Sequence, residues 1–267
     1  MAGTADGARD RRMDASRTRL LVGEDGLDRL AGACVVVAGV GGVGSNCAES
    51  LARCGVGTLV LVDGDVVSAS NANRQAIAFS STVGAPKVEV MAAMARDINP
   101  GVRALPVRRR IGAGDAGALL DEVRSATGSA ADFVVDALDS IVVKLALARE
   151  ASLRGVEVVS SMGAGNKFDP TRLEFADLFE TSMCPMCRAM RKQARARGID
   201  RLRVLYSRER AVDVPIAAGG RRGDRSNIGT MGYMPAIMGQ LIAADVVCAL
   251  LGLPRPGSSA PAGGPGR

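Results

Sequence analysis

A glycine-rich run could bind an anion through its backbone. Gly39, Gly41, Gly42 and Gly44 lie in the run GVGGVGS, directly after the apolar segment Cys34–Ala38 and at the start of a helical pattern. Backbone amides at a helix N-terminus, together with the helix dipole, attract phosphate groups. The placement therefore favours a nucleotide ligand over a tight strand-to-helix turn that binds nothing.

An acidic residue ends the next apolar run. Asp63 follows Thr58–Val62 and lies nineteen residues after Gly44, where a carboxylate can hold ribose hydroxyls. This pattern is also typical of NAD-binding proteins. The glycine run and Asp63 alone do not distinguish ATP from NAD.

The segment after Asp63 carries polar and basic side chains that suit phosphate chemistry. These candidate nucleotide-binding residues are Asp65, Asn71, Asn73, Arg74, Gln75 and Lys87. Hydride transfer does not need an arginine and a lysine beside the phosphates. Breaking the α–β phosphate linkage does, because negative charge accumulates on the departing pyrophosphate. We expect Arg74 and Lys87 to neutralise that charge, and Asn71 and Asn73 to orient the nucleotide.

A carboxylate for Mg²⁺ is also present. Asp139 lies in VVDALDS, at the end of the fourth predicted strand. Open α/β sheets bind ligands at the carboxyl ends of their strands, and Mg²⁺ prefers carboxylate oxygens. The chain contains no histidine, which excludes Ser-His, Cys-His and histidine-ligated metal chemistry.

Two of the six cysteines form a CPMC motif. For Cys184 and Cys187 three roles are open: inert thiols, a redox or sulfur-relay pair, or metal ligands shared across a dimer. The other four are expected to pack in the core, and they are Cys34, Cys47, Cys54 and Cys248.

Basic residues are concentrated in one segment. Residues 188–225 contain twelve arginines or lysines and four acidic residues, a net charge of +8, whereas the whole chain carries +6. Arg188, Arg191 and Arg195 recur at helical spacing with Lys192 beside them. This stripe is a candidate RNA-binding face, and the alternative is a solvated, arginine-rich helix.

Alternating apolar runs and helical patterns predict the elements that position these residues. Expected strands are Cys34–Ala38, Thr58–Val62, Val102–Val107, Asp132–Ala137, Val156–Ser161 and Leu202–Ser207. Expected helices are Val43–Cys54, Pro86–Ile98, Asp115–Arg124, Ile141–Leu153, Cys187–Arg197 and Met234–Leu251. Nearly continuous apolar strands separated by helices are typical of an α/β Rossmann-like, doubly wound, mostly parallel sheet.

A chain of 267 residues, of which 47% are hydrophobic, suits one main domain. We expect disordered tails over 1–17 and 253–267, and one domain over 18–252 that has a core at 33–165 and a C-terminal extension at 166–252. Charge or glycine interrupts each apolar run before membrane-spanning length, and the N-terminus does not resemble a signal peptide. A cytoplasmic protein without a membrane partner is expected.

The runs GVGGVGS, LVDGD, SNANRQ, VGAPKVEV and VVDALDS resemble the adenylating domains of the ubiquitin-activating, MoeB and ThiF superfamily. The resemblance implies ATP and Mg²⁺ as cofactors. It places Asp63 on the ribose, Asn71, Arg74, Gln75 and Lys87 around the triphosphate, and Asp139 on Mg²⁺. It also implies a homodimer in which an N-terminal arginine enters the partner's site. Arg19 is the expected residue, and Arg17 is the alternative.

Within this superfamily, the later segments resemble the tRNA threonylcarbamoyladenosine dehydratases. These segments are SSMGAGNKFDPTRLEFADL, CRAMRKQARARGI, LRVLYSRE and GTMGYMPAIMGQLIAADVV. The resemblance implies ATP-dependent activation of a threonyl carboxylate in tRNA, followed by ring closure. Such an intramolecular attack gains from proximity.

Two other functions are considered. The first is activation of the C-terminal carboxylate of a ubiquitin-like sulfur carrier. That branch normally carries two CxxC pairs for zinc, and this chain has one. The second is a nucleotide-binding partner of a cysteine desulfurase or sulfur-acceptor system that lacks turnover, which loss of Arg74, Lys87 or Asp139 would favour. All three residues are present.

Overall fold

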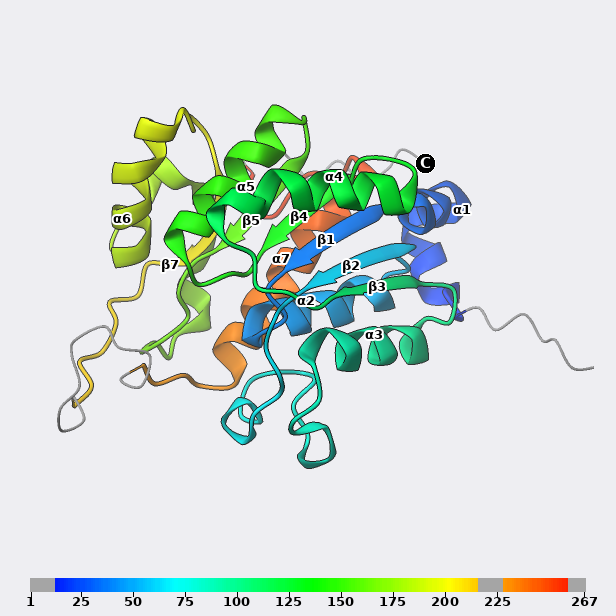
Figure 1. Cartoon of the computed structure of the whole chain (residues 1–267), viewed down its shortest axis with the longest axis horizontal. Helices are drawn as coiled ribbons and strands as arrows, with labels where there is room; N and C mark the ends of the chain where they lie inside the picture. The colour runs from blue at the N-terminus through cyan, green and yellow to red at the C-terminus, as the bar shows by residue number, and fades with distance from the viewer. Residues whose placement is uncertain (1–12, 216–227, 259–267) are drawn as a thin grey trace, which may run out of the picture.

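Seven strands form one sheet at the centre of the molecule (Figure 1). The structure is a computed structural model and describes residues 13–215 and 228–258. The strands are β1 (Cys34–Ala38), β2 (Thr58–Val62), β3 (Arg103–Val107), β4 (Phe133–Asp136), β5 (Glu157–Ser161), β6 (Leu173–Asp177) and β7 (Arg203–Ser207). Their order is β3-β2-β1-β4-β5-β7-β6, with β6 antiparallel to β7 and the other pairs parallel. The predicted fold class is confirmed.

Helices cover both faces of the sheet, as expected for a mostly parallel sheet. They are α1 (Ser16–Gly32), α2 (Gly42–Arg53), α3 (Lys87–Ile98), α4 (Ala116–Thr127), α5 (Ile141–Leu153), α6 (Pro185–Ala194) and α7 (Tyr233–Leu251). In Figure 1, α2, α3 and α7 lie on one side of the sheet and α4 and α5 on the other.

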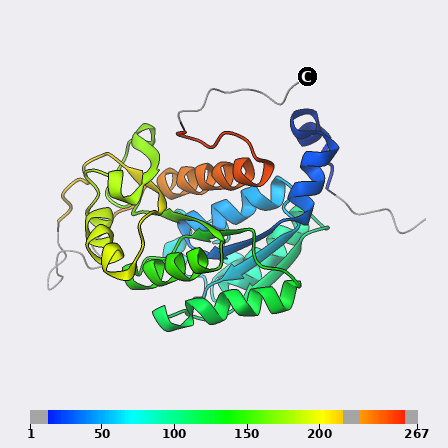
Figure 2. The same ribbon diagram turned by 90° about the horizontal axis from the view of Figure 1, so that it is seen from above.

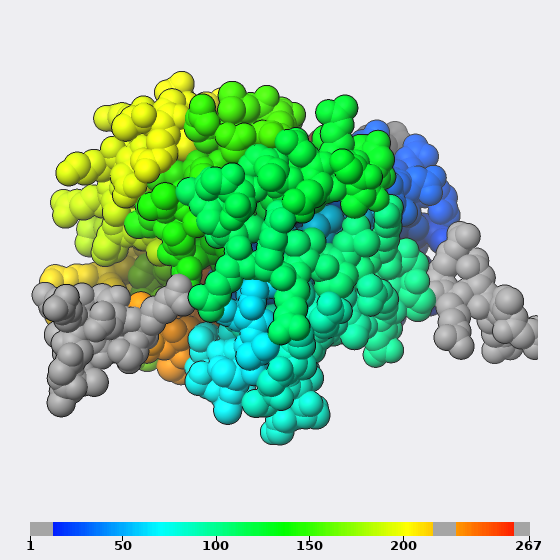
Figure 3. All heavy atoms as spheres, viewed as in Figure 1, coloured from blue at the N-terminus to red at the C-terminus, as the bar shows by residue number. Residues whose placement is uncertain are grey.

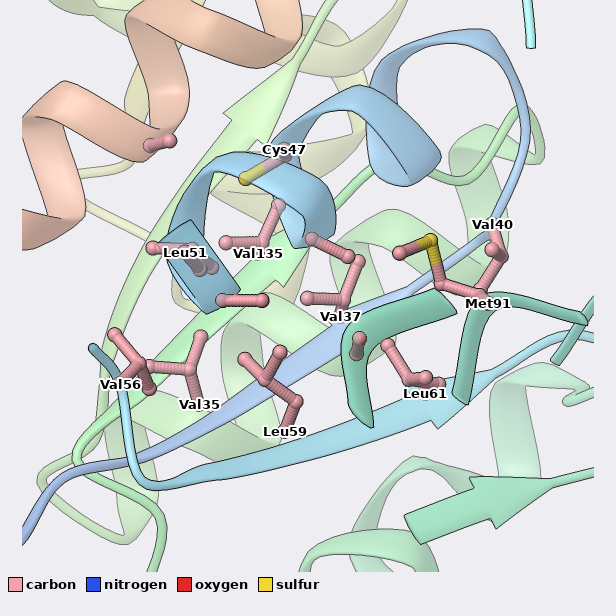
Figure 4. Packing of buried hydrophobic residues seen from close by; sticks show 14 of the residues in the cluster. Val35, Val37, Val40, Cys47, Leu51, Val56, Leu59, Leu61, Met91 and Val135 are labelled. Atoms are coloured by element: carbon pink, nitrogen blue, oxygen red, sulfur yellow. The ribbon is translucent and has the colours of Figure 1, made fainter. Parts of the chain in front are cut away.

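The core follows the two-residue repeat of the strands. Val35 and Val37 of β1 point toward α2 and pack with buried residues such as Cys47 and Leu51 (Figure 4). Val36, between them, faces the opposite side and joins the cluster under α4 and α5. Strands buried on both faces explain why the sequence shows continuous apolar runs here.

The apolar helix α7 packs against α2, with α1 across its far end (Figure 2). Among the described residues it is the one helix long and apolar enough to cross a membrane, judged by length and composition. Half of its apolar window is buried, however, and Met238, Ile242 and Val246 belong to the core. Its composition is therefore explained by packing inside the domain.

Three features differ from the sequence-based expectations. Helix α1 starts within the predicted N-terminal tail, at Ser16, and contains a break at Gly23 (φ 69°), so its periodicity is weak in the sequence. Strand β6 is absent from the predicted strands because its short run mixes apolar and acidic residues. Residues 253–258 fall in the predicted disordered tail, yet Arg255 forms ion pairs with Asp245 and Glu157. Residues 1–12 and 259–267 lie outside the described part.

Candidate active site

The glycine loop between β1 and α2 lies at the carboxyl edge of the sheet. Gly39 has φ +90°, a conformation that favours glycine. A Cβ atom on Gly44 would lie 1.7 Å from the carbonyl oxygen of Gly39, so a side chain cannot be accommodated there. No described side chain caps the start of α2. Its first amides can therefore bind an anion.

Asp63 is fixed beside this loop. Its Oδ2 atom accepts a hydrogen bond from the amide of Val40 (2.8 Å), and its Oδ1 atom accepts one from the amide of Asp65 (2.8 Å). Each carboxylate oxygen has a further lone pair for an external donor. Asp63 thus lies at the end of β2, at the same edge of the sheet as the glycine loop.

Lys87, the first residue of α3, is buried against two acidic side chains. Its Nζ atom lies 3.1 Å from Asp65 Oδ2 and 4.0 Å from Asp63 Oδ2. Asp65 also pairs with Arg110 at 2.6 Å. Burial alone would raise the pKa of Asp65, but hydrogen bonds from Lys87 and Arg110 outweigh it and lower that pKa. Asp65 therefore holds Lys87 in place near Asp63.

The segment that carries Asn71 and Arg74 projects from the end of β2 and closes over the glycine loop. In Figure 3, this cyan region forms a lobe beside the orange start of α7. The side chain of Asn71 is buried, and its Oδ1 atom accepts a hydrogen bond from the amide of Ser68. Arg74 Nη1 donates to Asn73 Oδ1 (2.9 Å) and to the carbonyl of Ser70 (2.9 Å). These bonds fix the guanidinium of Arg74.

Gln75 faces the glycine loop from the same segment. Its side chain is buried, and a Cβ atom on Gly41 would lie 4.0 Å from Gln75 Nε2. Its Oε1 atom is buried without a hydrogen-bond partner in the described part of the chain. Buried polar atoms are normally paired. The Gln75 amide thus lies beside the glycine loop and keeps one unused acceptor.

Asp139 lies on the turn that follows β4. The turn contacts the glycine loop, because a Cβ atom on Gly39 would lie 2.6 Å from the carbonyl oxygen of Ala137. The Asp139 side chain is exposed at this edge. A carboxylate here is chemically suited to a hard cation such as Mg²⁺.

A buried ionic network supports this turn. Asp136 Oδ2 lies 3.0 Å from Lys144 Nζ, and both side chains are fully buried. The hydroxyl of Ser160 donates to the same oxygen at 2.5 Å, and the amide of Leu138 donates to Asp136 Oδ1 at 3.2 Å. The network therefore ties the turn that bears Asp139 to strands β4 and β5.

Comparison with known proteins agrees with this geometry. The family model described as the ThiF family matches residues 15–262. This chain belongs to the ThiF family. A tRNA threonylcarbamoyladenosine dehydratase from Bacillus subtilis (strain 168) is 37% identical over 248 residues, which cover 88% of this chain and 94% of that protein.

A ThiF-family fold is also found among solved structures. The Escherichia coli tRNA N6-threonylcarbamoyladenosine dehydratase in complex with ATP matches with a TM-score of 0.77 and 28% identity, covering 94% of this chain and 98% of that one. By contrast, the molybdopterin-synthase adenylyltransferase of E. coli (strain K12) is 36% identical over 120 residues, 45% of each protein. The similarity to the dehydratases thus extends through the C-terminal extension.

Arg19 lies away from the nucleotide-binding edge of its own chain. It is on α1, which precedes β1 and so lies toward the amino ends of the strands, opposite the glycine loop (Figure 1). Its side chain is half exposed and pairs with Glu24 at 2.8 Å. Within one chain of this ThiF-family protein, Arg19 does not join the other predicted site residues. Arg17, the alternative, is on the same helix.

The residues of the predicted basic stripe differ in exposure at helix α6. Arg188, Lys192 and Arg195 are exposed. Arg191 is half-buried and donates from Nη1 to the carbonyl of Thr181 at 2.9 Å, so it holds the preceding turn instead of facing solvent. The periodicity of the sequence could not show this contact. Three arginines of the basic segment, at 221, 222 and 225, lie outside the described residues.

All six cysteines are free thiols in the structure. Cys34 and Cys47 are buried, as expected for core residues, and Cys54 and Cys248 are half-buried. Burial raises the pKa of the Cys34 thiol to about 11 and that of Cys47 further. The described residues contain no group of three or more potential metal ligands.

Sequence reasoning did not identify three residues that build this ThiF-family site. Ser45 Oγ donates a hydrogen bond to the carbonyl of Gly41 (2.6 Å) and accepts one from the amide of Ala76 (3.1 Å). Asn46 Nδ2 donates to the carbonyls of Gly42 (2.7 Å) and Arg74 (3.2 Å). Both therefore join the glycine loop to the segment above it. Lys144, the third, was detectable as a lone lysine in the apolar run IVVKLALA.

Proposed function

We propose that this protein uses ATP to adenylate the threonyl carboxylate of threonylcarbamoyladenosine in tRNA and then closes it into a ring with net loss of water. The observation that carries the proposal is the similarity to a dehydratase over 88% of this chain and 94% of that protein. The intact glycine loop, with Asp63, Arg74 and Lys87 around it, supports ATP as the cofactor.

ATP binding follows from the site as described. The α2 amides and dipole attract the phosphates, and Asp63 accepts hydrogen bonds from the ribose hydroxyls. Asp139 would hold Mg²⁺, which would neutralise phosphate charge when bound. The exposed carboxylate beside the glycine loop fits that ion.

Residues of this chain then catalyse a reaction in two steps. In the first step, a carboxylate oxygen of the threonyl group attacks the α-phosphorus of ATP, and pyrophosphate leaves. Arg74 and Lys87 stabilise the charge on the departing group. In the second step, a nucleophilic atom of the same threonylcarbamoyl group attacks the activated carbonyl carbon, and AMP leaves with the carboxylate oxygen. Because both groups belong to one substrate, proximity favours ring closure.

A homodimer would complete the site through Arg19 of the second subunit. Leu20 and Leu21, next to Arg19 on α1, are 86% and 78% exposed. Two large apolar side chains exposed at adjacent positions suit a protein interface. We propose that this region lies in the dimer interface and carries Arg19 into the site of the partner.

The protein is proposed to work in the cytoplasm, where tRNA is its substrate and a cysteine desulfurase or sulfur-acceptor system is a further candidate partner. Activation of a sulfur carrier is less well supported, because the match to a molybdopterin-synthase adenylyltransferase covers 45% of this chain. A role without turnover is not favoured either, since Arg74, Lys87 and Asp139 are all present.

Mass spectrometry of tRNA nucleosides tests the proposal in cells. A strain that lacks its own dehydratase should regain the cyclic nucleoside, one water lighter than threonylcarbamoyladenosine, when this protein is expressed. Arg74→Ala at equal expression should restore little of it. If the tRNA still contained only uncyclised threonylcarbamoyladenosine when the wild-type protein was expressed, the proposal would be refuted.

A further inference from the structure

Cys184 and Cys187 occupy the start of helix α6 and are not used by the proposed reaction. Cys184 is the N-cap residue of α6, and Cys187 lies in its first turn. With the radius and rise of an α-helix, Cα atoms three residues apart are about 5 Å from each other, which is within the Cα separation of roughly 4.4–6.8 Å that a disulfide spans. The two thiols are hydrogen-bonded to each other. The backbone therefore places the two cysteines close enough for a disulfide.

The surroundings of Cys184 stabilise a thiolate. The hydrogen bond with the Cys187 thiol does most to lower the pKa of Cys184 below its ordinary value, and burial opposes it. The amides of Cys187 and Met186 at the start of α6, together with the charge of Lys167, lower it further. Helix N-termini and nearby cations act in this way on other cysteines.

The buried ammonium of Lys167 is a second feature that favours a negative charge on Cys184. Lys167 is 4% exposed, and its Nζ atom makes only long contacts to the carbonyls of Gly163 (3.4 Å) and Ser207 (3.5 Å). No carboxylate lies within ion-pair distance of it in the described part of the chain. A buried ammonium without an acidic partner is costly, and a thiolate at Cys184 offsets that cost.

Both cysteines are buried, Cys184 less completely than Cys187. Cys184 is 5% exposed and follows Met183, which is 64% exposed, whereas Cys187 is fully buried. The pKa of Cys187 is raised, chiefly by its hydrogen bond to Cys184 and by burial, although Thr181 and Arg191 act in the opposite direction. Cys184, the less buried of the two and the one whose thiolate is stabilised, is thus the nucleophile, and Cys187 is available for a second step.

We propose that Cys184 and Cys187 form a redox-active dithiol that reacts with low-molecular-weight disulfides. The Cys184 thiolate attacks one sulfur of the small disulfide, forms a mixed disulfide and expels a thiolate. Cys187 loses its proton to that thiolate, attacks the Cys184 sulfur and expels the second half of the reagent as a thiolate. Two electrons pass from the dithiol to the small disulfide, and an internal disulfide results.

Alkylation of the folded, reduced full-length protein tests the nucleophile. Iodoacetamide would be applied between pH 5 and 9 in the presence of a chelator, followed by peptide mass spectrometry of each cysteine. Labelling of Cys184 should be half-maximal well below the pKa of a free thiol, and Cys187 should stay unlabelled. Cys187→Ala should move the midpoint upward toward about 8.5, the value of a free thiol. Cys248→Ala is the matched control and should leave the midpoint unchanged.

Oxidation tests the second step. Oxidised glutathione should produce a Cys184–Cys187 disulfide in the wild-type protein and a mixed disulfide on Cys184 in Cys187→Ala. The wild-type measurements do not depend on whether that variant folds. Labelling of Cys184 with a midpoint at or above about 8.5, absence of labelling in the folded protein, or failure of glutathione to link the two cysteines would each overturn the proposal.

Discussion

The ammonium of Lys144 lies 3.0 Å from the carboxylate of Asp136, and neither side chain has exposed surface. Lys144 Nζ also donates to the carbonyl of Asp136 and to the hydroxyl of Ser160. The pair lies beneath the turn that places Asp139 beside the glycine loop. Removing one partner leaves a buried, uncompensated charge, which is far more costly than removing both.

Lys144→Met should therefore lower the free energy of unfolding by about 3–5 kcal/mol. Urea denaturation monitored by circular dichroism measures the change. Adding Asp136→Leu to this variant should recover part of the loss, because no buried charge is then unpaired. Lys192→Met, an exposed lysine on α6, is the control and should change stability by less than about 0.5 kcal/mol. Equal stability of Lys144→Met and wild type would show that the network is unimportant.

Gly42→Val should weaken ATP binding by about 100-fold or more, because hydrogen bonds to a charged phosphate contribute about 1.5–3 kcal/mol each. A Cβ atom at Gly42 would lie 3.0 Å from Pro235 Cβ and 3.4 Å from Arg74 Cγ. A branched side chain would displace the loop or Arg74. Isothermal titration calorimetry measures the affinity.

The matched control for Gly42→Val is Gly114→Val, since nothing lies within 4 Å of a Cβ atom at Gly114. Its ATP affinity should equal that of the wild type. Normal ATP binding by Gly42→Val would move the phosphate site away from the α2 N-terminus.

Part of this site could be predicted from the sequence because local patterns determine it. The run from Cys34 to Asp63 fixes strand, glycine turn, helix and acidic residue within thirty residues. The pairing of Lys87 with Asp65, and of Arg191 with Thr181, depends on contacts that no local pattern encodes. Lys144 and Asp136 show the same limit: each interrupts an apolar run, and only the packing of α5 on β4 brings them together.

Arg19 should act across the dimer. Arg19→Ala and Lys87→Ala proteins are each expected to be inactive, and a mixture that exchanges subunits should recover about a quarter of wild-type activity, since half of the dimers contain one intact site. AMP release with tRNA present is the readout. A mixture that stays inactive, although native mass spectrometry shows heterodimers, would place Arg19 outside the composite site.

The exposed basic residues of α6 and of the turn that follows it should bind tRNA phosphates. The triple variant Arg188→Ala, Lys192→Ala and Arg195→Ala should lower tRNA affinity and reduce the slope of log affinity against log salt by about three units, roughly one for each phosphate that is no longer neutralised. ATP affinity should not change, because none of these side chains belongs to the nucleotide site. Filter binding across a salt series measures the slope.

A charge-matched control separates local binding from net charge. Arg53→Ala, Arg124→Ala and Arg149→Ala together remove three positive charges from α2, α4 and α5. This control should retain most of the tRNA affinity and the wild-type salt slope. If both triple variants lose tRNA binding equally, α6 is not a specific RNA-binding face.

The most direct test of the central claim is a reaction of the purified protein with ATP, Mg²⁺ and tRNA that carries threonylcarbamoyladenosine. Nucleoside mass spectrometry and AMP quantification would be made on the same samples. We predict a nucleoside lighter by one water, one AMP released for each one formed, and a rate about 100-fold to 1,000-fold lower for Arg74→Ala, since that is the effect of losing one charge-stabilising group. Unchanged tRNA under conditions in which the protein adenylates the C-terminus of a ubiquitin-like sulfur carrier would contradict the account.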